Sequence, residues 1–113
     1  MQVHSDKKHD VYICRIKGEI NLDNVDKLAE VFKGAIDSKS RKVLLDLSGL
    51  DYIDSAGFAS LIQFSKELKD IDGVLFLSGL TPKIRSLFAI TKLEKAFKIY
   101  DTEGEALEDS CSY

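Results

Sequence analysis

The segment of the sequence best suited to chemistry is Leu50–Phe58, which reads Leu-Asp-Tyr-Ile-Asp-Ser-Ala-Gly-Phe. It joins an apolar run to an amphipathic stretch, so Ser55 is predicted at or beside the start of a helix. In open α/β sheets, ligands and partners usually meet the protein at the carboxyl ends of the strands. Gly57 removes a side chain from a place where another backbone or a phosphate could approach.

Two interpretations of Ser55 are open. In the first, Asp54 or Ser55 only caps the helix, accepting a hydrogen bond from a first-turn N–H group and contributing about 1 kcal/mol. In the second, Ser55 accepts a phosphoryl group, whose charge of roughly −1.5 to −2 would lie at the positive end of the helix dipole. First-turn N–H groups would favour that charge, whereas Asp51 and Asp54 would oppose it. Phosphorylation of Ser55 would hardly change the fold, so a capping role and a role as a phosphorylation switch are compatible.

Catalysis by the chain itself is the competing class of function. Ser55 lacks the Gly-x-Ser-x-Gly pattern of a nucleophile elbow, because Ile53 stands two residues before it. The only histidines, His4 and His9, lie in the polar first ten residues. No Gly-x-x-x-x-Gly-Lys loop is present to hold a nucleotide. We therefore expect a protein that is not an enzyme and needs no cofactor.

The acidic and sulfur-containing residues do not have the spacing of a metal site. Asp46, Asp51 and Asp54 lack the pattern of a calcium loop and are interpreted as turn and cap residues. Cys14 and Cys111 are far apart in the sequence and are interpreted as free thiols in a reducing cytoplasm.

Length and charge exclude several classes of protein. The chain has 113 residues, which predicts a single domain spanning 1–113. Sixteen basic and 19 acidic residues give a net charge of −3, without the basic run of a nucleic-acid-binding protein. Apolar runs such as Val43–Leu45 and Val74–Leu77 are too short for membrane insertion. The polar segment Met1–Asp10 lacks the apolar core of a signal peptide.

Hydrophobic patterns predict strands that alternate with helices. The predicted strands are a weak one in the first ten residues, then Val11–Lys17 ended by Gly18, Lys42–Leu47, Val74–Leu77 and Phe97–Tyr100. The predicted helices are one from Leu22 to Ile36 capped by Asn21 or Asp23, then Phe58–Ile71, one starting at Thr81-Pro82, and Asp101–Asp109.

This order predicts an α/β fold with a mixed, largely parallel sheet of four to five strands, covered by about four helices. Whether the helices cover one face or both is left open. The core is expected within about 11–107, with mobile ends at 1–10 and 110–113. Phe58 and Phe88 are interpreted as core residues, and Pro82 as the first residue of its helix.

Four segments of the chain, in order, resemble the STAS domain, whose single-domain members are the anti-sigma factor antagonists. Asp54-Ser55-Ala56-Gly57, after an apolar strand, is similar to the Asp-Ser-Ser-Gly signature of that family. The other segments that resemble the family are Gly18–Asn21, Asp72–Leu77, and Thr81–Phe88 with Leu93. The resemblance extends from about Val11 to Leu107.

The resemblance implies a protein that binds an anti-sigma factor, which in this family is a serine kinase. The unphosphorylated antagonist sequesters the kinase and frees the sigma factor, phosphorylation releases the kinase, and a serine phosphatase resets the cycle. Carried onto this chain, the phosphorylated serine is Ser55. We expect the partner to dock on Ser55 and its surroundings: Asn21, Asp54, Ala56, Gly57, Ala59 and Gln63. For the last two, packing of Ala59 and solvation of Gln63 is the alternative.

The chain departs from the family pattern in two places. Ala56 replaces the second serine of the signature, which leaves the acceptor in place. Asn21 stands where the family usually has Asp; Asn still caps a helix but carries no charge. If that Asp helps to position the kinase or its nucleotide, the chain binds without being phosphorylated. The alternative function is therefore a STAS interaction module of a stress-signalling or lipid-transport assembly.

Overall fold

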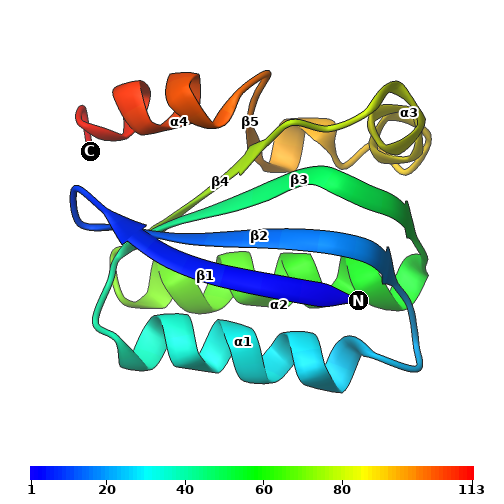
Figure 1. Cartoon of the computed structure of the whole chain (residues 1–113), viewed down its shortest axis with the longest axis horizontal. Helices are drawn as coiled ribbons and strands as arrows, with labels where there is room; N and C mark the ends of the chain where they lie inside the picture. Colours follow the sequence, from blue (N-terminus) through cyan, green and yellow to red (C-terminus); the bar gives the residue numbers. More distant parts are fainter.

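The computed structural model describes all residues, 1–113, and contains one five-stranded sheet with helices on both faces (Figure 1). The strands are β1 (Gln2–Lys8), β2 (Val11–Ile20), β3 (Lys42–Ile53), β4 (Val74–Ser78) and β5 (Lys98–Tyr100). The helices are α1 (Val25–Asp37), α2 (Ser55–Asp70), α3 (Pro82–Ile90), the 3-10 turn η1 (Glu94–Ala96) and α4 (Glu103–Ser110). None of the helices is long and apolar enough to cross a membrane.

The strands lie in sequence order, β1-β2-β3-β4-β5. β1 pairs antiparallel with β2, and the other three pairings are parallel. The predicted α/β class and the mixed, largely parallel sheet are therefore confirmed. In a parallel sheet the carboxyl ends of the strands meet at one edge, which places the end of β2 beside the end of β3.

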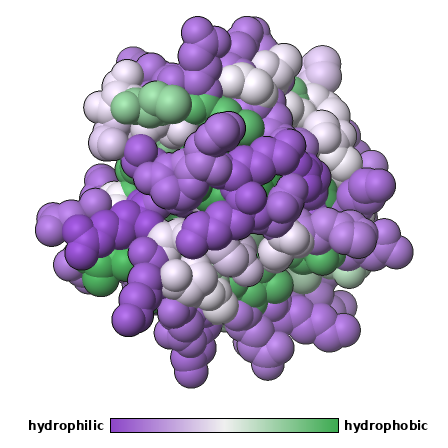
Figure 2. Space-filling view, turned by 60° about the vertical axis from the view of Figure 1, so that its left-hand side comes forward, coloured by the Kyte–Doolittle hydropathy of each residue, from purple (hydrophilic) through white to green (hydrophobic).

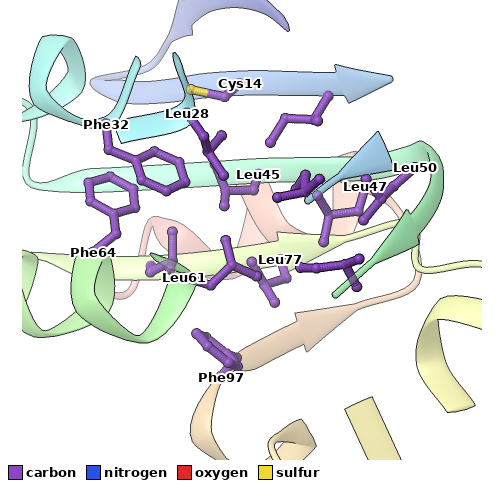
Figure 3. Close-up of a cluster of buried hydrophobic side chains, with 14 of the residues drawn as sticks. Cys14, Leu28, Phe32, Leu45, Leu47, Leu50, Leu61, Phe64, Leu77 and Phe97 are labelled. Carbon is purple, nitrogen blue, oxygen red and sulfur yellow. The ribbon is translucent and has the colours of Figure 1, made fainter. Parts of the chain in front are cut away.

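The two faces of the sheet are covered by different helices. On one face, alternate residues such as Cys14 and Leu45 contact α1 and α2, and Phe32 stacks on Phe64 at 4.0 Å between ring centroids (Figure 3). On the other face, a smaller cluster that includes Phe76 packs against Ala106 of α4. The sequence left open whether helices cover one face of the sheet or both, and the structure shows that they cover both.

The weak strand predicted in the first ten residues is confirmed. Residues 2–8 form a full strand, with Val3 opposite Ile16 in the pairing with β2. Most side chains of β1 are exposed, so the strand is held by backbone hydrogen bonds and leaves no apolar pattern in the sequence. At the other end of the chain, Ser110 is buried and the Tyr113 ring meets Phe76 edge-on at 5.3 Å between ring centroids.

Two strands are longer than predicted: β2 runs past Gly18, which was expected to end it, and β3 runs past the predicted end at Leu47. β2 continues through Gly18 to Ile20, and β3 continues through Gly49 to Ile53. Gly18 has φ +94°, and the β2–β3 register shifts between Gly18 and Glu19. A Cβ on Gly49 would lie 2.7 Å from Lys17 Cγ. Both glycines therefore accommodate an irregular, close strand pairing instead of a turn.

Candidate functional site

Asp54 and Ser55 lie where β3 gives way to α2. Asp54 has an extended backbone, with φ −97°, and is the N-cap of α2. Its Oδ1 accepts a hydrogen bond from the backbone N–H of Gly57 at 3.0 Å. Ser55 is the first helical residue. Of the two residues that the sequence offered as the cap, the structure therefore assigns capping to Asp54.

The same carboxylate also holds the loop between β2 and α1. Asp54 Oδ2 accepts from the backbone N–H of Leu22 at 3.0 Å, and the Asp54 N–H donates to the carbonyl of Ile20 at 3.1 Å. These bonds place Asn21 and Leu22 beside the first turn of α2. The loop and the helix start, distant in sequence, thus form one continuous surface around Ser55.

The Ser55 side chain is exposed, and its hydroxyl makes no hydrogen bond within the chain. In the first turn of a helix, N–H groups lack intrahelical acceptors and carry the positive end of the dipole. An exposed hydroxyl at this position is accessible to a modifying enzyme, and a phosphoryl group added there would meet a favourable field.

The predicted cap of α1 is wrong. The helix begins at Val25 after Asn24, and neither Asn21 nor Asp23 caps it. The half-buried Asn21 instead accepts a hydrogen bond at Oδ1 from the Asp23 N–H at 3.0 Å. Asn24 closes the same loop, since its Oδ1 accepts from the Asn21 N–H and its Nδ2 donates to Glu19.

Gly57 occupies a different environment from the rest of the signature. It is buried, and a Cβ at this position would lie 2.6 Å from Ile53 Cγ1 and 2.8 Å from Ile20 Cγ2. We therefore correct the expectation that Gly57 faces a partner or a phosphate: it lets α2 approach the strand ends. Ala56, by contrast, is half-buried and lies next to Ser55.

The first part of α2 presents an exposed surface beyond Ser55. Ala59 and Gln63 follow at intervals of four residues and are both exposed, so the alternative in which Ala59 packs into the core is wrong. Gln63 donates from Nε2 to Glu67 Oε1 at 3.2 Å. Phe58 is buried and meets Phe88 edge-on at 4.9 Å, as expected for a core residue.

Leu22 is the surface residue that sequence reasoning missed. The apolar spacing put it on the buried stripe of α1, but it lies in the loop before that helix and is 73% exposed. Its amide is the group that Asp54 binds. Tyr52, 40% exposed at the end of β3, is a second apolar side chain near this edge, with Lys83 Nζ 5.7 Å from its ring centroid.

No catalytic partner is placed beside Ser55. His4 pairs with Arg15 in the middle of the β1–β2 ladder, and His9 lies in the turn at the far end of β2. No group of three or more His, Cys, Asp or Glu side chains is arranged to hold a metal ion. Asp46 accepts from the Ser48 N–H at 3.0 Å, which is the contact of a turn residue. Cys14 and Cys111 are both free thiols.

Comparison with known proteins agrees with this fold. The family model of the STAS domain matches residues 2–106. BtrV of Bordetella bronchiseptica, named as a candidate anti-sigma factor antagonist, is 31% identical over 106 residues, covering 94% of this chain and 91% of BtrV. The anti-sigma-B factor antagonist of Staphylococcus aureus (strain NCTC 8325) is 28% identical over 97 residues, covering 86% of this chain and 88% of that protein.

A solved structure extends the likeness to three dimensions. The crystal structure of a candidate anti-sigma factor antagonist, TM1081 of Thermotoga maritima, superposes with a TM-score of 0.88 at 27% identity, covering 95% of this chain and 92% of that one. The sheet order, the helix that follows Asp54 and the matches along nearly the whole chain lead to one assignment. The chain belongs to the STAS domain family of anti-sigma factor antagonists.

Proposed function

We propose that this protein binds an anti-sigma factor serine kinase when Ser55 is unphosphorylated and is released when the kinase phosphorylates Ser55. A serine phosphatase would then restore the binding form. The observation that carries the proposal is the Ser55 hydroxyl, which is exposed and spared from capping because Asp54 caps α2. Binding to a kinase that uses ATP, together with two free thiols, fits a cytoplasmic protein.

The binding surface in this proposal is built from two segments. Asn21 and Leu22 come from the loop that Asp54 holds, and Ser55, Ala59 and Gln63 come from α2. Asp54 and Ala56 lie between them. A partner that covers this surface would exclude water from the Ser55 hydroxyl, so a group added there would directly change the contact.

Phosphorylation would act through charge. The two added charges would meet the N-terminal amides of α2, which lower their cost within the chain. Asp54 and the exposed Asp51 precede Ser55 closely in the chain and add negative charge. An acidic group of a docked partner would then be repelled at close range in a desolvated contact. A hundredfold loss of affinity requires only about 2.7 kcal/mol.

The test is a binding titration against the cognate kinase. We expect Ser55→Ala to bind as tightly as the unphosphorylated wild type and to stay bound in ATP, and Ser55→Asp to bind about a hundredfold more weakly. Ser112→Asp, which adds the same charge at an exposed position near the chain end, is the matched control and should bind as wild type does. Equal affinities for the wild type and both Ser55 variants would refute the proposal.

Asn21 supports a second candidate, an interaction module that is never phosphorylated. Its side chain is uncharged and already accepts a hydrogen bond within the loop. Incubation with kinase and ATP, followed by mass mapping, separates the two candidates: a phosphoryl group on Ser55 of the wild type supports the switch. An unmodified wild type together with a modified Asn21→Asp variant would favour the second candidate.

A further inference from the structure

A second site lies at the end of the sheet opposite Ser55. There the β1–β2 turn, the α1–β3 turn and the α2–β4 turn line an open cavity of about 650 Å³. Four basic residues line it: Lys7, Lys39, Arg41 and Lys42. We call this cavity the basic basin. Figure 2 turns this end of the molecule toward the viewer and shows it covered largely by hydrophilic side chains.

The charge of the basic basin is opposite to that of the whole chain. The chain has 19 acidic and 16 basic residues, yet the four basic residues of the basin face only two acidic ones, Asp10 and Asp72. Within the basin, the only ion pair joins Lys42 Nζ to Asp10 Oδ2 at 3.7 Å. The Lys42 side chain is 16% exposed, so its charge is screened less than that of a surface lysine.

A buried hydroxyl in the basin wall lacks a partner. Ser40 is 4% exposed and lines the cavity, and its Oγ has no hydrogen-bond partner. Buried polar side chains are almost always hydrogen-bonded, so this hydroxyl points to an acceptor that the chain does not supply. Because Oγ is closed off from water, an incoming oxygen reaches it only after a neighbouring side chain shifts.

The basin wall is held rigidly by its backbone. The Val74 N–H donates to the Arg41 carbonyl at 2.7 Å, which ties the α2–β4 turn to the α1–β3 turn. Gly73 makes this approach possible, since a Cβ there would lie 2.8 Å from the Arg41 carbonyl oxygen. A preformed wall lowers the ordering cost of binding.

We propose that the basic basin binds the phosphate groups of a small phosphorylated ligand. Arg41 offers a planar fork of N–H donors to phosphate oxygens, and Lys39 and Lys7 add mobile positive charge. Once a neighbouring side chain shifts, the Ser40 hydroxyl donates to one further oxygen. The cavity volume lies within the range of small-molecule sites. The length of β3 separates this site from Ser55, so ligand binding does not depend on the phosphorylation switch.

The test is an NMR titration of the isotope-labelled full chain with pyrophosphate and, separately, with ATP, both at constant ionic strength. We expect saturable shifts of the backbone amides of residues 39–42 and 72–74, and none at Ser55. Arg41→Gln should weaken binding about tenfold, or about 1.4 kcal/mol, and Ser40→Ala about fivefold. Lys66→Gln, which removes an exposed charge of α2 outside the basin, is the matched control and should not change the affinity.

The outcomes are distinct. Tighter binding of ATP than of pyrophosphate supports a nucleotide ligand, and equal binding supports recognition of the phosphate groups alone. Absence of saturable shifts with both probes overturns the proposal. It is also overturned if Lys66→Gln weakens binding as much as Arg41→Gln, because the effect is then a general attraction to positive charge.

Discussion

The Asp54 carboxylate accepts a hydrogen bond from the backbone N–H of Leu22, 32 residues earlier in the chain, at 3.0 Å. With its other oxygen it accepts from the Gly57 N–H at the same distance. One side chain therefore caps α2 and fastens the loop between β2 and α1 to it. The site around Ser55 consists of two segments because Asp54 joins them.

Replacing Asp54 should weaken both connections. We expect Asp54→Ala to lower the free energy of unfolding by about 1–2 kcal/mol, through loss of the cap and of the Leu22 bond. Asp54→Asn should cost less, because the amide oxygen still accepts from one N–H group. Urea denaturation followed by circular dichroism measures both. An Asp54→Ala variant as stable as the wild type would show that the carboxylate does not hold the loop.

Replacing Gly57 and Gly34 by alanine should change the stability of the fold in opposite directions. Gly57→Ala should destabilise the fold by about 1–3 kcal/mol, since its Cβ would overlap with Ile53 and Ile20. Gly34→Ala, in an exposed part of α1 with no atom within 4 Å of the added Cβ, should stabilise it by about 0.5–1 kcal/mol. Both are read from urea unfolding midpoints. A Gly57→Ala variant that is more stable than the wild type would mean that the two isoleucines move aside easily.

The elements that the sequence predicted well are those whose signal is local. The strand Val74–Ser78 contains the continuous apolar run Val74–Leu77, and Thr81-Pro82 carries its own start signal. In the structure Thr81 Oγ1 accepts from the Ile84 N–H at 3.3 Å, as expected for a cap followed by proline. Buried runs and side-chain caps depend on residues a few positions apart, so a single sequence is enough to find them.

The features that the sequence predicted weakly or wrongly depend on distant residues. β1 was predicted only as a weak strand, because it is polar and is held by its pairing with β2, as between Val3 and Ile16. α1 was predicted to start at Leu22 but starts at Val25, because the loop before it is held by Asp54. Gly18 was expected to end β2, but its positive φ serves a bulged pairing with β3. Each of these depends on strand register or on a contact across the chain.

Phosphorylation of Ser55 should change binding without unfolding the protein. A negative charge at the first position of α2 is favoured by the helix dipole by about 0.3–1 kcal/mol, and the adjacent Asp54 opposes it. We expect Ser55→Asp and Ser55→Ala each to stay within about 1 kcal/mol of the wild type in free energy of unfolding. Thermal and urea denaturation provide the check. A larger loss in Ser55→Asp would attribute weak kinase binding to partial unfolding.

The two thiols should differ sharply in reactivity. Cys14 is fully buried, and this burial raises the pKa of its thiol to about 11, so at pH 8 only about one thiol in a thousand is the reactive thiolate. Cys111 is exposed. With a chromogenic disulfide reagent at pH 8 we expect one fast-reacting thiol in the native protein, none in Cys111→Ser, and two after denaturation.

The pH dependence of stability follows from the same shift in Cys14. The neutral thiol is favoured in the folded state. Its contribution to stability is therefore complete below pH 9, the pKa of the thiol in the unfolded chain, and is lost as the pH rises toward the folded-state pKa of about 11. Cys14→Ala should remove this alkaline loss but lower stability at pH 7, because a buried side chain is truncated. Urea unfolding at pH 7 and pH 10.5 distinguishes the two effects. Equal alkaline loss in both proteins would show that other groups, such as tyrosines, govern it.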